Sequence, residues 1–286
     1  MIVVETANDL RETMAPWRKQ GDRIVFVPTM GNLHEGHLQL MSVARQHGKK
    51  VVASIFVNPM QFDRDDDFTS YPRTLEEDLN VLRVEGVDLV FVPDKKEMYP
   101  RPLSEMSYVE VPHLGDRLEG ASRPGHFRGV TTVVTRLFSL VGPDAAVFGS
   151  KDYQQLLIIR RMVDDLGMSI EIIGEPTIRE TDGLAMSSRN SILSADERKI
   201  APRLYETLQF CRSRILGQGV TLAQAEADAI RELQKAGFTP DYVGIRRQSD
   251  LMMPDERETE LVIVAAAWLG KARLIDNIEL SLNRAD

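Results

Sequence analysis

Residues 23–57 read RIVFVPTMGNLHEGHLQLMSVARQHGKKVVASIFV, and this stretch predicts a strand, a helix and a second strand. The run 23–30 is apolar and β-rich and ends at Gly31. The run 37–48 reads as a helix closed by glycine, and 50–57 is a second apolar strand. Two strands that are apolar throughout, joined by a helix, are typical of parallel strands covered on both faces.

The same alternation continues as far as Pro176. It predicts three more helices and three more strands, which are the helices 73–86, 129–142 and 153–167 and the strands 87–93, 144–150 and 169–176. We therefore expect an α/β fold whose first domain, 1–176, is a Rossmann-like parallel sheet with helices on both faces. In such sheets ligands bind at the carboxyl ends of the strands.

A smaller α+β domain is expected over 177–286, where the pattern changes. Residues 194–217 predict one long helix and 222–237 another, followed by β-like runs at 241–247 and 261–280. Capping-box spacing marks two predicted helix starts, at the pairs Thr74 with Glu77 and Ser194 with Glu197.

Composition excludes several classes of protein. The 286 residues carry 35 Lys and Arg against 43 Asp and Glu, a net charge of −8, which argues against nucleic acid as a partner. The single Cys211 cannot form an internal disulfide, which fits a reducing compartment. No apolar run is long enough to span a membrane and no signal peptide is evident, so we expect a cytoplasmic protein without a membrane partner. The acidic run 63–68 reads as a solvated loop rather than a metal site.

The strongest candidate site is PTMGNLHEGHLQL, residues 28–40, which leaves a strand and opens a helix. A helix N-terminus attracts phosphate, and His34 and His37 can donate further hydrogen bonds to it. Gly31 and Gly36 let a flat nucleotide approach the backbone. A nucleotide site is favoured over a plain helix cap, and zinc is disfavoured because no further ligand set is evident.

Two more loops offer groups for an anion. In GSKDYQQL, residues 149–156, Lys151 could neutralise phosphate, Asp152 could accept from a ribose hydroxyl or a metal-bound water, and Gln155 would point into the same crevice. In DGLAMSSRN, residues 182–190, two serines and an arginine suit an anion. Taken alone, the first loop also fits an ordinary capped helix start, and the second fits a plain linker.

A fourth loop, SIFVNPMQF at 54–62, carries Asn58 and Gln61 after the second strand. Their neutral amides suit a hydroxylated substrate, although a turn built around Pro59 is the alternative. The sequence contains neither a Walker A motif nor a G-x-G-x-x-G after a strand. A nucleotide would therefore have to be held by the two histidines and their glycines.

These motifs together resemble a known family. HEGH at 34–37 is similar to the HIGH signature of the nucleotidylyltransferase superfamily, and MSSRN at 186–190 is similar to its KMSKS-type loop. The ordered set resembles the pantothenate synthetase family along nearly the whole chain, through VPTMGNLHEGH, FVNPMQF, YPRTLEEDL, EGASRPGHFRGV, KDYQQL, DGLAMSSRN and AAWLGKARLIDN.

The resemblance implies a homodimeric, Mg²⁺-requiring enzyme whose C-terminal domain serves as a lid. Its two-step reaction joins pantoate to β-alanine at the expense of ATP, through a pantoyl-adenylate, and releases AMP and pyrophosphate. The implied product, pantothenate, is a precursor of coenzyme A.

Site residues follow from the resemblance position by position. His37 would be the catalytic histidine and proton donor, with His34, Lys151 and Arg189 as its catalytic companions. The implied ATP-binding residues are Met30, Gly31, Asn32, Leu33, His34, Glu35, Gly36, His37, Gly149, Ser150, Lys151, Asp152, Ile178, Met186, Ser187, Ser188 and Arg189. The implied substrate-binding residues are Gln61, Gln155, Asn58 and Arg123, and the implied metal ligand is Asp78.

One position departs from the family pattern. The family usually has Glu before the lysine of the KDYQQ stretch, where this chain has Ser150. Three alternatives to the ligase stay open at this point. They are a nucleotidylyltransferase that stops after nucleotidyl transfer, a regulatory nucleotide-binding module without turnover, and a remnant of a tRNA ligase, which the acidic balance disfavours.

Overall fold

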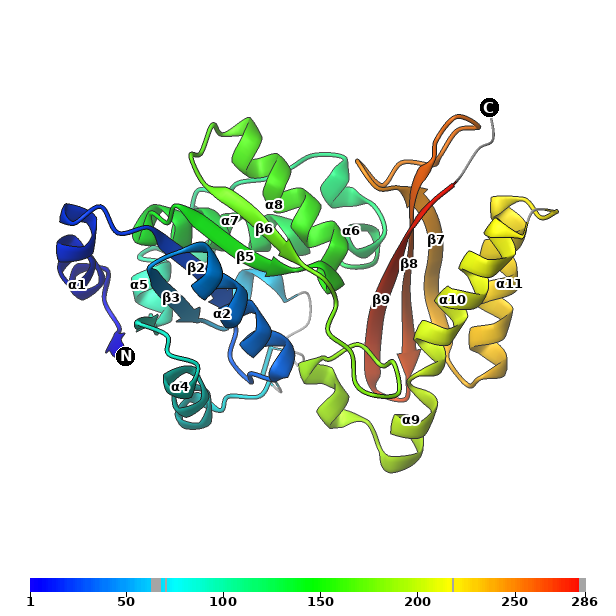
Figure 1. Ribbon diagram of the computed structural model, residues 1–286, viewed down its shortest axis with the longest axis horizontal. Coiled ribbons are helices and arrows are strands. Elements are labelled where there is room, and N and C mark those ends of the chain that lie inside the picture. Colours follow the sequence, from blue (N-terminus) through cyan, green and yellow to red (C-terminus); the bar gives the residue numbers. More distant parts are fainter. Residues whose placement is uncertain (63–67, 70, 218, 283–286) are drawn as a thin grey trace. The chain divides into compact units, whose positions relative to one another are not determined.

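The first part of the chain forms a six-stranded sheet in the order β1-β4-β3-β2-β5-β6, and every neighbouring pair is parallel. This computed structural model describes residues 1–62, 68–69, 71–217 and 219–282, so most of the predicted acidic loop lies outside the described residues. The strands are β1 (Ile2–Val4), β2 (Ile24–Thr29), β3 (Lys50–Ile55), β4 (Leu89–Phe91), β5 (Ala145–Gly149) and β6 (Glu171–Glu175). The predicted parallel sheet is confirmed (Figure 1).

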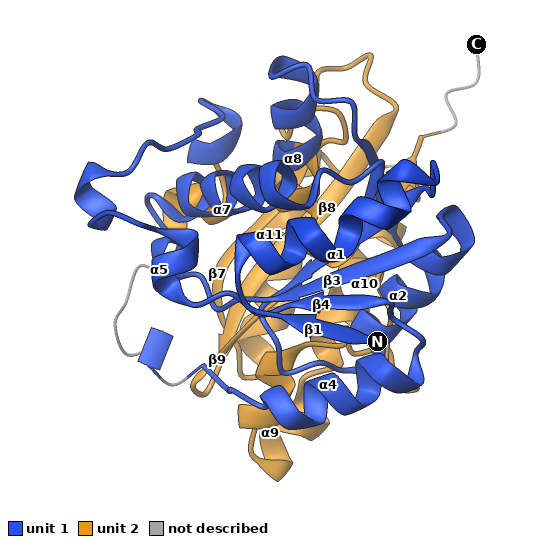
Figure 2. Ribbon diagram, turned by 90° about the vertical axis from the view of Figure 1, so that its left-hand side faces the viewer, with its two compact units in different colours: residues 1–116, 123–150, 158–176 blue, residues 117–122, 151–157, 177–286 orange. Residues whose placement is uncertain are grey.

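Helices cover both faces because alternate side chains of β2 point to opposite sides. Val25 and Val27 belong to one buried cluster with residues of α2 (Glu35–His47) and α4 (Leu75–Val84). On the other face Phe26 meets Phe138 of α7 edge to face, with ring centroids 6.3 Å apart. Figure 2 shows α1 and α7 on one side of the strands and α4 on the other. The other helices before residue 176 are α1 (Ala7–Lys19), α5 (Lys95–Met98), α6 (Glu119–Ser122), α7 (His126–Val141) and α8 (Tyr153–Asp165).

The strand order places a topological switch point between β2 and β5. The chain moves from β2 to β3 in one direction and from β5 to β6 in the other. Because β2 and β5 are parallel neighbours, paired at Val25 with Ala145, the loops that follow them leave the same edge of the sheet. Such a switch point is where open α/β sheets bind ligands. The loops after Thr29 and Gly149 are two of the segments in which the sequence predicts nucleotide-binding residues.

The N-terminal strand β1 and helix α1 were not anticipated from the sequence. β1 is only three residues long and pairs with β4 alone, so it lacks the long apolar run of the inner strands. Thr6 is the N-cap of helix α1, and its hydroxyl accepts a hydrogen bond from the backbone N–H of Asp9 over 3.1 Å. It buries Leu10 and Met14 completely.

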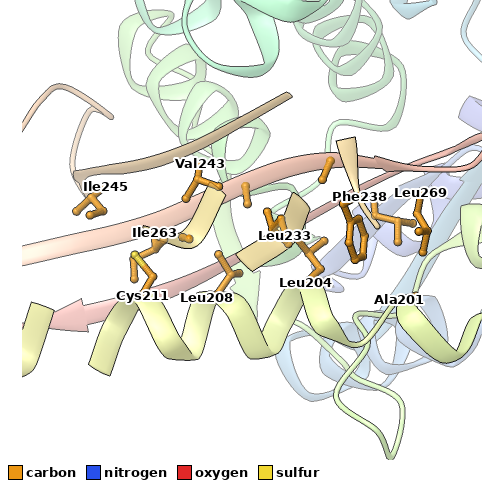
Figure 3. Close-up of a cluster of buried hydrophobic side chains, with 14 of the residues drawn as sticks. Ala201, Leu204, Leu208, Cys211, Leu233, Phe238, Val243, Ile245, Ile263 and Leu269 are labelled. Carbon is orange, nitrogen blue, oxygen red and sulfur yellow. The ribbon is translucent and has the colours of Figure 1, made fainter. Parts of the chain in front are cut away.

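The C-terminal part is a three-stranded antiparallel sheet with two helices packed against it. Strands β7 (Thr239–Arg247), β8 (Glu260–Leu269) and β9 (Ala272–Ser281) lie in that order. Helices α10 (Arg203–Leu216) and α11 (Leu222–Lys235) share a buried cluster with β7, β8 and β9, in which Leu204, Leu208 and Cys211 come from α10 (Figure 3). The predicted smaller α+β part is confirmed.

The long helix predicted over 194–217 is wrong in one respect. The structure has α9 (Ala195–Ile200) and α10, with Ala201 and Pro202 between them. Pro202 has no N–H to donate, and its ring clashes with the carbonyl four residues earlier, so it cannot continue α9. It stands instead immediately before the first turn of α10, where a missing N–H costs nothing. The capping box of Ser194 and Glu197 at the start of α9 is present.

The described chain divides into two compact units (Figure 2). The first comprises 1–116, 123–150 and 158–176, and the second comprises 117–122, 151–157 and 177–286. The two short segments lie within the range that the sequence assigned to the first domain. Within the described residues no helix combines the length and the apolar character needed to cross a membrane.

Candidate active site

The loop after β2 is fixed by a buried carboxylate. Asp78, on α4, is 3% exposed and accepts from the backbone N–H of Asn32 (2.9 Å) and of Leu33 (2.8 Å). Gly31 has φ +81°, and a Cβ there would lie 2.9 Å from Asp78 Oδ2. Asn32 also has a left-handed backbone, φ +52°, which asparagine tolerates better than most residues. The loop therefore requires glycine at 31 and a hydrogen-bond acceptor at 78.

The expected capping box at the start of α4 does not form. The hydroxyl of Thr74 donates to Asp78 Oδ2 over 3.2 Å instead of capping its own helix. Asp78 thus accepts three hydrogen bonds, and both of its carboxylate oxygens are engaged. We find no group of three or more His, Cys, Asp or Glu side chains with metal-binding geometry among the described residues. The metal role of Asp78 stays a prediction, and its contacts favour the task of holding the loop 31–33.

The two histidines lie together at the N-terminus of α2. The rings of His34 and His37 are 4.1 Å apart between centroids, and His34 is the N-cap residue. The backbone N–H of His34 donates to Nδ1 of His37 over 3.3 Å. Because Nδ1 is an acceptor here, neutral His37 carries its proton on Nε2 and can donate from that atom. Glu35 is exposed, and Gly36 is half-buried in the first turn.

A 3-10 turn after β3 (Pro59–Gln61) carries the predicted amides. Asn58 is 1% exposed and donates from Nδ2 to Gln61 Oε1 (3.0 Å) and to the carbonyl of Gly129 (3.1 Å). Gln61 Nε2 lies 3.1 Å from the sulfur of Met30, at the end of β2. The structure therefore brings the loop after β2 and the turn after β3 together.

Arg123 and His126 both contact the turn Pro59–Gln61. Arg123 lies in the loop before α7, and His126 is the first residue of α7. Arg123 donates to the backbone carbonyl of Gln61 over 3.2 Å, and Nδ1 of His126 lies 2.7 Å from that oxygen. A carbonyl oxygen only accepts, so Nδ1 of His126 carries the proton. Sequence reasoning missed His126, although it lies in the ASRPGHF motif that pointed to Arg123.

Residues 151–157, the lysine segment, belong to the second unit and are held by its C-terminal strand β9. Asn277 of β9 donates from Nδ2 to the backbone carbonyl of Lys151 over 2.9 Å. Asp152 is exposed, whereas Gln155 is half-buried in the first turn of α8. Gly149 and Ser150, which precede this segment, belong to the first unit.

The predicted loop 182–190, the serine loop, is anchored to the same strand through Arg179, which lies just before it. Arg179 forms a bidentate ion pair with Asp276 (2.6 and 2.9 Å), and its guanidinium lies 3.5 Å from the centroid of the Tyr205 ring. Burial raises the pKa of Asp276, and the bonds from Arg179 oppose that rise. The backbone N–H of Met186 donates to the carbonyl of Ile178 over 2.9 Å, which closes a short hairpin.

The tip of this loop is ordered by its own side chains. Ser187 is the N-cap of a 3-10 helix (Ser188–Ile192), and its hydroxyl accepts from the backbone N–H of Arg189 over 3.2 Å. Asn190 donates to the carbonyl of Ala185 over 3.0 Å. A small pocket within the second unit is lined by Lys151, Ala185, Ser187, Asn190 and Asp276, among others. The structure thus joins the predicted lysine and serine segments in one unit.

The chain is similar to known proteins along nearly its whole length. Residues 2–279 match the family model described as pantoate-beta-alanine ligase. The pantothenate synthetase of Vibrio vulnificus (strain CMCP6) is 56% identical over 268 residues, which are 94% of this chain and 89% of the relative. The pantothenate synthetase of Aeromonas hydrophila is 52% identical over 285 residues and is covered completely, as is this chain.

Solved structures give the same result. The pantothenate synthetase of Thermus thermophilus superposes with a TM-score of 0.89 at 46% identity, covering 97% of this chain and 99% of that one. The pantoate-beta-alanine ligase of Francisella tularensis, solved with beta-gamma ATP and beta-alanine, has a TM-score of 0.80 at 34% identity and 97% coverage of both chains. With a family model that spans nearly all of its residues, the chain belongs to the pantoate–β-alanine ligase family.

Proposed function

We propose that the protein joins pantoate to β-alanine at the expense of ATP and releases pantothenate, AMP and pyrophosphate. The family match over residues 2–279 carries this proposal. Pantothenate is a precursor of coenzyme A, so the enzyme works in that biosynthesis.

The reaction proceeds in two substitutions. A carboxylate oxygen of pantoate attacks the α-phosphorus of ATP, and the bond to pyrophosphate breaks, which gives pantoyl-adenylate. The amine nitrogen of β-alanine then attacks the acyl carbon, and AMP leaves with the oxygen that bridged carbon and phosphorus. The amine loses its protons to solvent or a base. Neither step needs a covalent nucleophile from the protein, because positioning and charge neutralisation supply the catalysis.

The first unit supplies the phosphate end of the site. We assign phosphate binding to the backbone N–H groups at the start of α2 and to the Nε2–H of His37, and the His34 ring lies tilted beside the His37 ring. We assign the ATP contacts of this unit to the loop Met30–His37 and to Gly149 and Ser150. The support is their position at the switch point of the sheet.

We assign phosphate-binding cations and hydroxyls to the second unit. Lys151 and Arg189 neutralise phosphate charge that develops as pyrophosphate leaves. Ser187 and Ser188 donate from their hydroxyls, while the backbone of Met186 and Ile178 and the side chain of Asp152 complete the nucleotide contacts. The anchoring of both segments to β9 supports this assignment, since a preorganised cation is worth more than a mobile one.

Pantoate is held by amides rather than by further charges. Gln61 and Gln155 bind its hydroxyl and carboxylate oxygens, and Asn58 and Arg123 lie in the contacts that hold Gln61. Neutral donors avoid competition with ATP for the cationic groups.

Mg²⁺ is proposed to accompany ATP, with no ligand from the protein assigned to it. Mg²⁺ commonly stays on substrate phosphates and water, and the three bonds that Asp78 accepts hold the loop 31–33 and Thr74. When bound, the ion neutralises phosphate charge. We also propose a homodimer in the cytoplasm, with the second unit serving as a lid.

An omission assay tests the function. The protein is incubated with ATP, Mg²⁺, pantoate and β-alanine, and AMP, ADP and pyrophosphate are separated by ion-exchange chromatography. AMP and pantothenate should appear in equal amounts, and only when every component is present. ADP with phosphate would exclude the adenylate route. Without β-alanine the adenylate route gives about one pyrophosphate per active site, so continued pyrophosphate release without AMP would indicate a nucleotidylyltransferase that stops after the first step.

A further inference from the structure

Tyr99 lies in the loop after α5 and is 4% exposed, with its hydroxyl 2.7 Å from Oδ1 of Asn58. Burial raises the pKa of Tyr99 and the nearby Arg136 opposes that rise, so the phenol keeps its proton. The backbone N–H of Met60 also donates to Oδ1 of Asn58, over 3.1 Å.

The amide of Asn58 has only one possible orientation. A backbone N–H can only donate, so the atom of Asn58 that faces Met60 must be the oxygen. A backbone carbonyl can only accept, so the atom that faces Gly129 must be the nitrogen. Two obligate groups therefore fix the side chain, and Tyr99 must be the donor in its own bond to Oδ1.

The orientation of the Asn58 amide in turn fixes the orientation of the Gln61 amide. The second N–H of Asn58 points to Gln61 Oε1 at 3.0 Å, so Oε1 is the engaged acceptor. The NH₂ group of Gln61 is then the end that lies beside Met30 at the exit of β2. Gly129 secures the turn, because a Cβ there would overlap the carbonyl of Met60 and lie 2.7 Å from the backbone nitrogen of Gln61.

We propose that Tyr99, acting through Asn58, is a positioning residue that orients Gln61 to present its NH₂ group, and that this group donates to an acceptor oxygen of pantoate. The inference rests on the proposed function and deepens it. At this end Gln61 donates a hydrogen bond to an acceptor oxygen of the substrate, such as a carboxylate oxygen. It does not accept a hydrogen bond from a hydroxyl group. Tyr99 makes no contact with substrate.

The first test replaces the amide of Gln61. Gln61→Glu keeps the shape and the acceptor for Asn58 but presents a carboxylate oxygen where the NH₂ group stood. Its kcat/KM for pantoate should fall at least as far as that of Gln61→Ala, by about tenfold or more, because a donor has become a repelling anion. A Gln61→Glu enzyme clearly more active than Gln61→Ala would show that this end accepts from a hydroxyl, which overturns the proposal.

The second test removes the phenol hydroxyl. Tyr99→Phe should lower kcat/KM for pantoate about fivefold to twentyfold, with KM for ATP within about twofold of wild type. Tyr242→Phe is the control, since Tyr242 is half-buried and its hydroxyl likewise donates to a side-chain oxygen, that of Glu119, over 2.9 Å in the second unit. It should leave both constants unchanged.

A double-mutant cycle separates positioning from general stability. Because Tyr99 acts through Gln61, Tyr99→Phe should cost little more in a Gln61→Ala background, within about twofold. Losses that multiply in the double mutant, or a Tyr99→Phe loss that is equal for pantoate and ATP, would contradict the inference. Wild-type enzyme that fails to consume pantoate would instead contradict the proposed function, so the two failures are distinguishable.

Discussion

The side-chain amide of Asn277 donates a hydrogen bond to the backbone carbonyl of Lys151 over 2.9 Å, across 126 positions of the chain. The neighbouring Asp276 forms the bidentate pair with Arg179. Two adjacent residues of β9 thus hold the lysine segment and the serine loop, which the sequence predicted as separate phosphate-binding elements.

Asn277→Ala should therefore weaken adenylation. The lysine segment loses a buried donor, and we expect single-turnover adenylate formation to slow about tenfold to a hundredfold, consistent with a loss of about 1–3 kcal/mol. Thr207→Val is the control, because Thr207 is buried in α10 and its hydroxyl donates to the carbonyl of Arg203 over 2.7 Å. Equal rates for Asn277→Ala and Thr207→Val would exclude a positioning role.

Asp78→Asn separates two roles for that carboxylate. An amide would turn an N–H toward the backbone N–H of Asn32 or Leu33, and the loop would lose an acceptor. Without any metal, the free energy of unfolding should fall by about 1–3 kcal/mol, measured by urea titration. Glu77→Gln, at an exposed neighbouring position, should leave it unchanged. Unchanged metal-free stability together with a higher Mg²⁺ requirement would support the metal role instead.

Cys211 should be inert in the native protein. Burial raises the pKa of its thiol to about 12, with Glu226 and Asp228 adding to the rise. Since only the thiolate reacts, and burial disfavours the anion, the thiol stays protonated at pH 8. A chromogenic disulfide reagent should modify no thiol in the native protein at pH 8 and one per chain in guanidinium. Rapid native modification would contradict the packing of α10.

Much of the fold could be predicted because the inner strands are buried on both faces. Runs such as 24–29 and 50–55 are mostly apolar, and each is followed along the chain by a helix with a clear stop. The short edge strand β1 lacks that signal. Pro202 predicts a break in the helix, but the apolar periodicity that continues over 194–217 favoured a single helix.

The predicted site residues came from local motifs, and the residues that support them did not. Tyr99 contacts Asn58 across 41 positions, and Asp78 contacts Asn32 across 46. Such pairs are created by the order of strands in the sheet, so no local pattern in the sequence reports them. Thr74 is an example of a local pattern that did not give the predicted structure. Its spacing to Glu77 fits a capping box, but its hydroxyl donates to Asp78 instead.

Oxygen transfer from pantoate to AMP tests the adenylate route most directly. Pantoate labelled with ¹⁸O in its carboxylate is turned over with unlabelled ATP and β-alanine, and the AMP is analysed by mass spectrometry. Because the bridging oxygen leaves with the phosphate, each AMP should carry one ¹⁸O atom and pyrophosphate none. AMP without label, or label in pyrophosphate, would contradict attack of the pantoate carboxylate on the α-phosphorus.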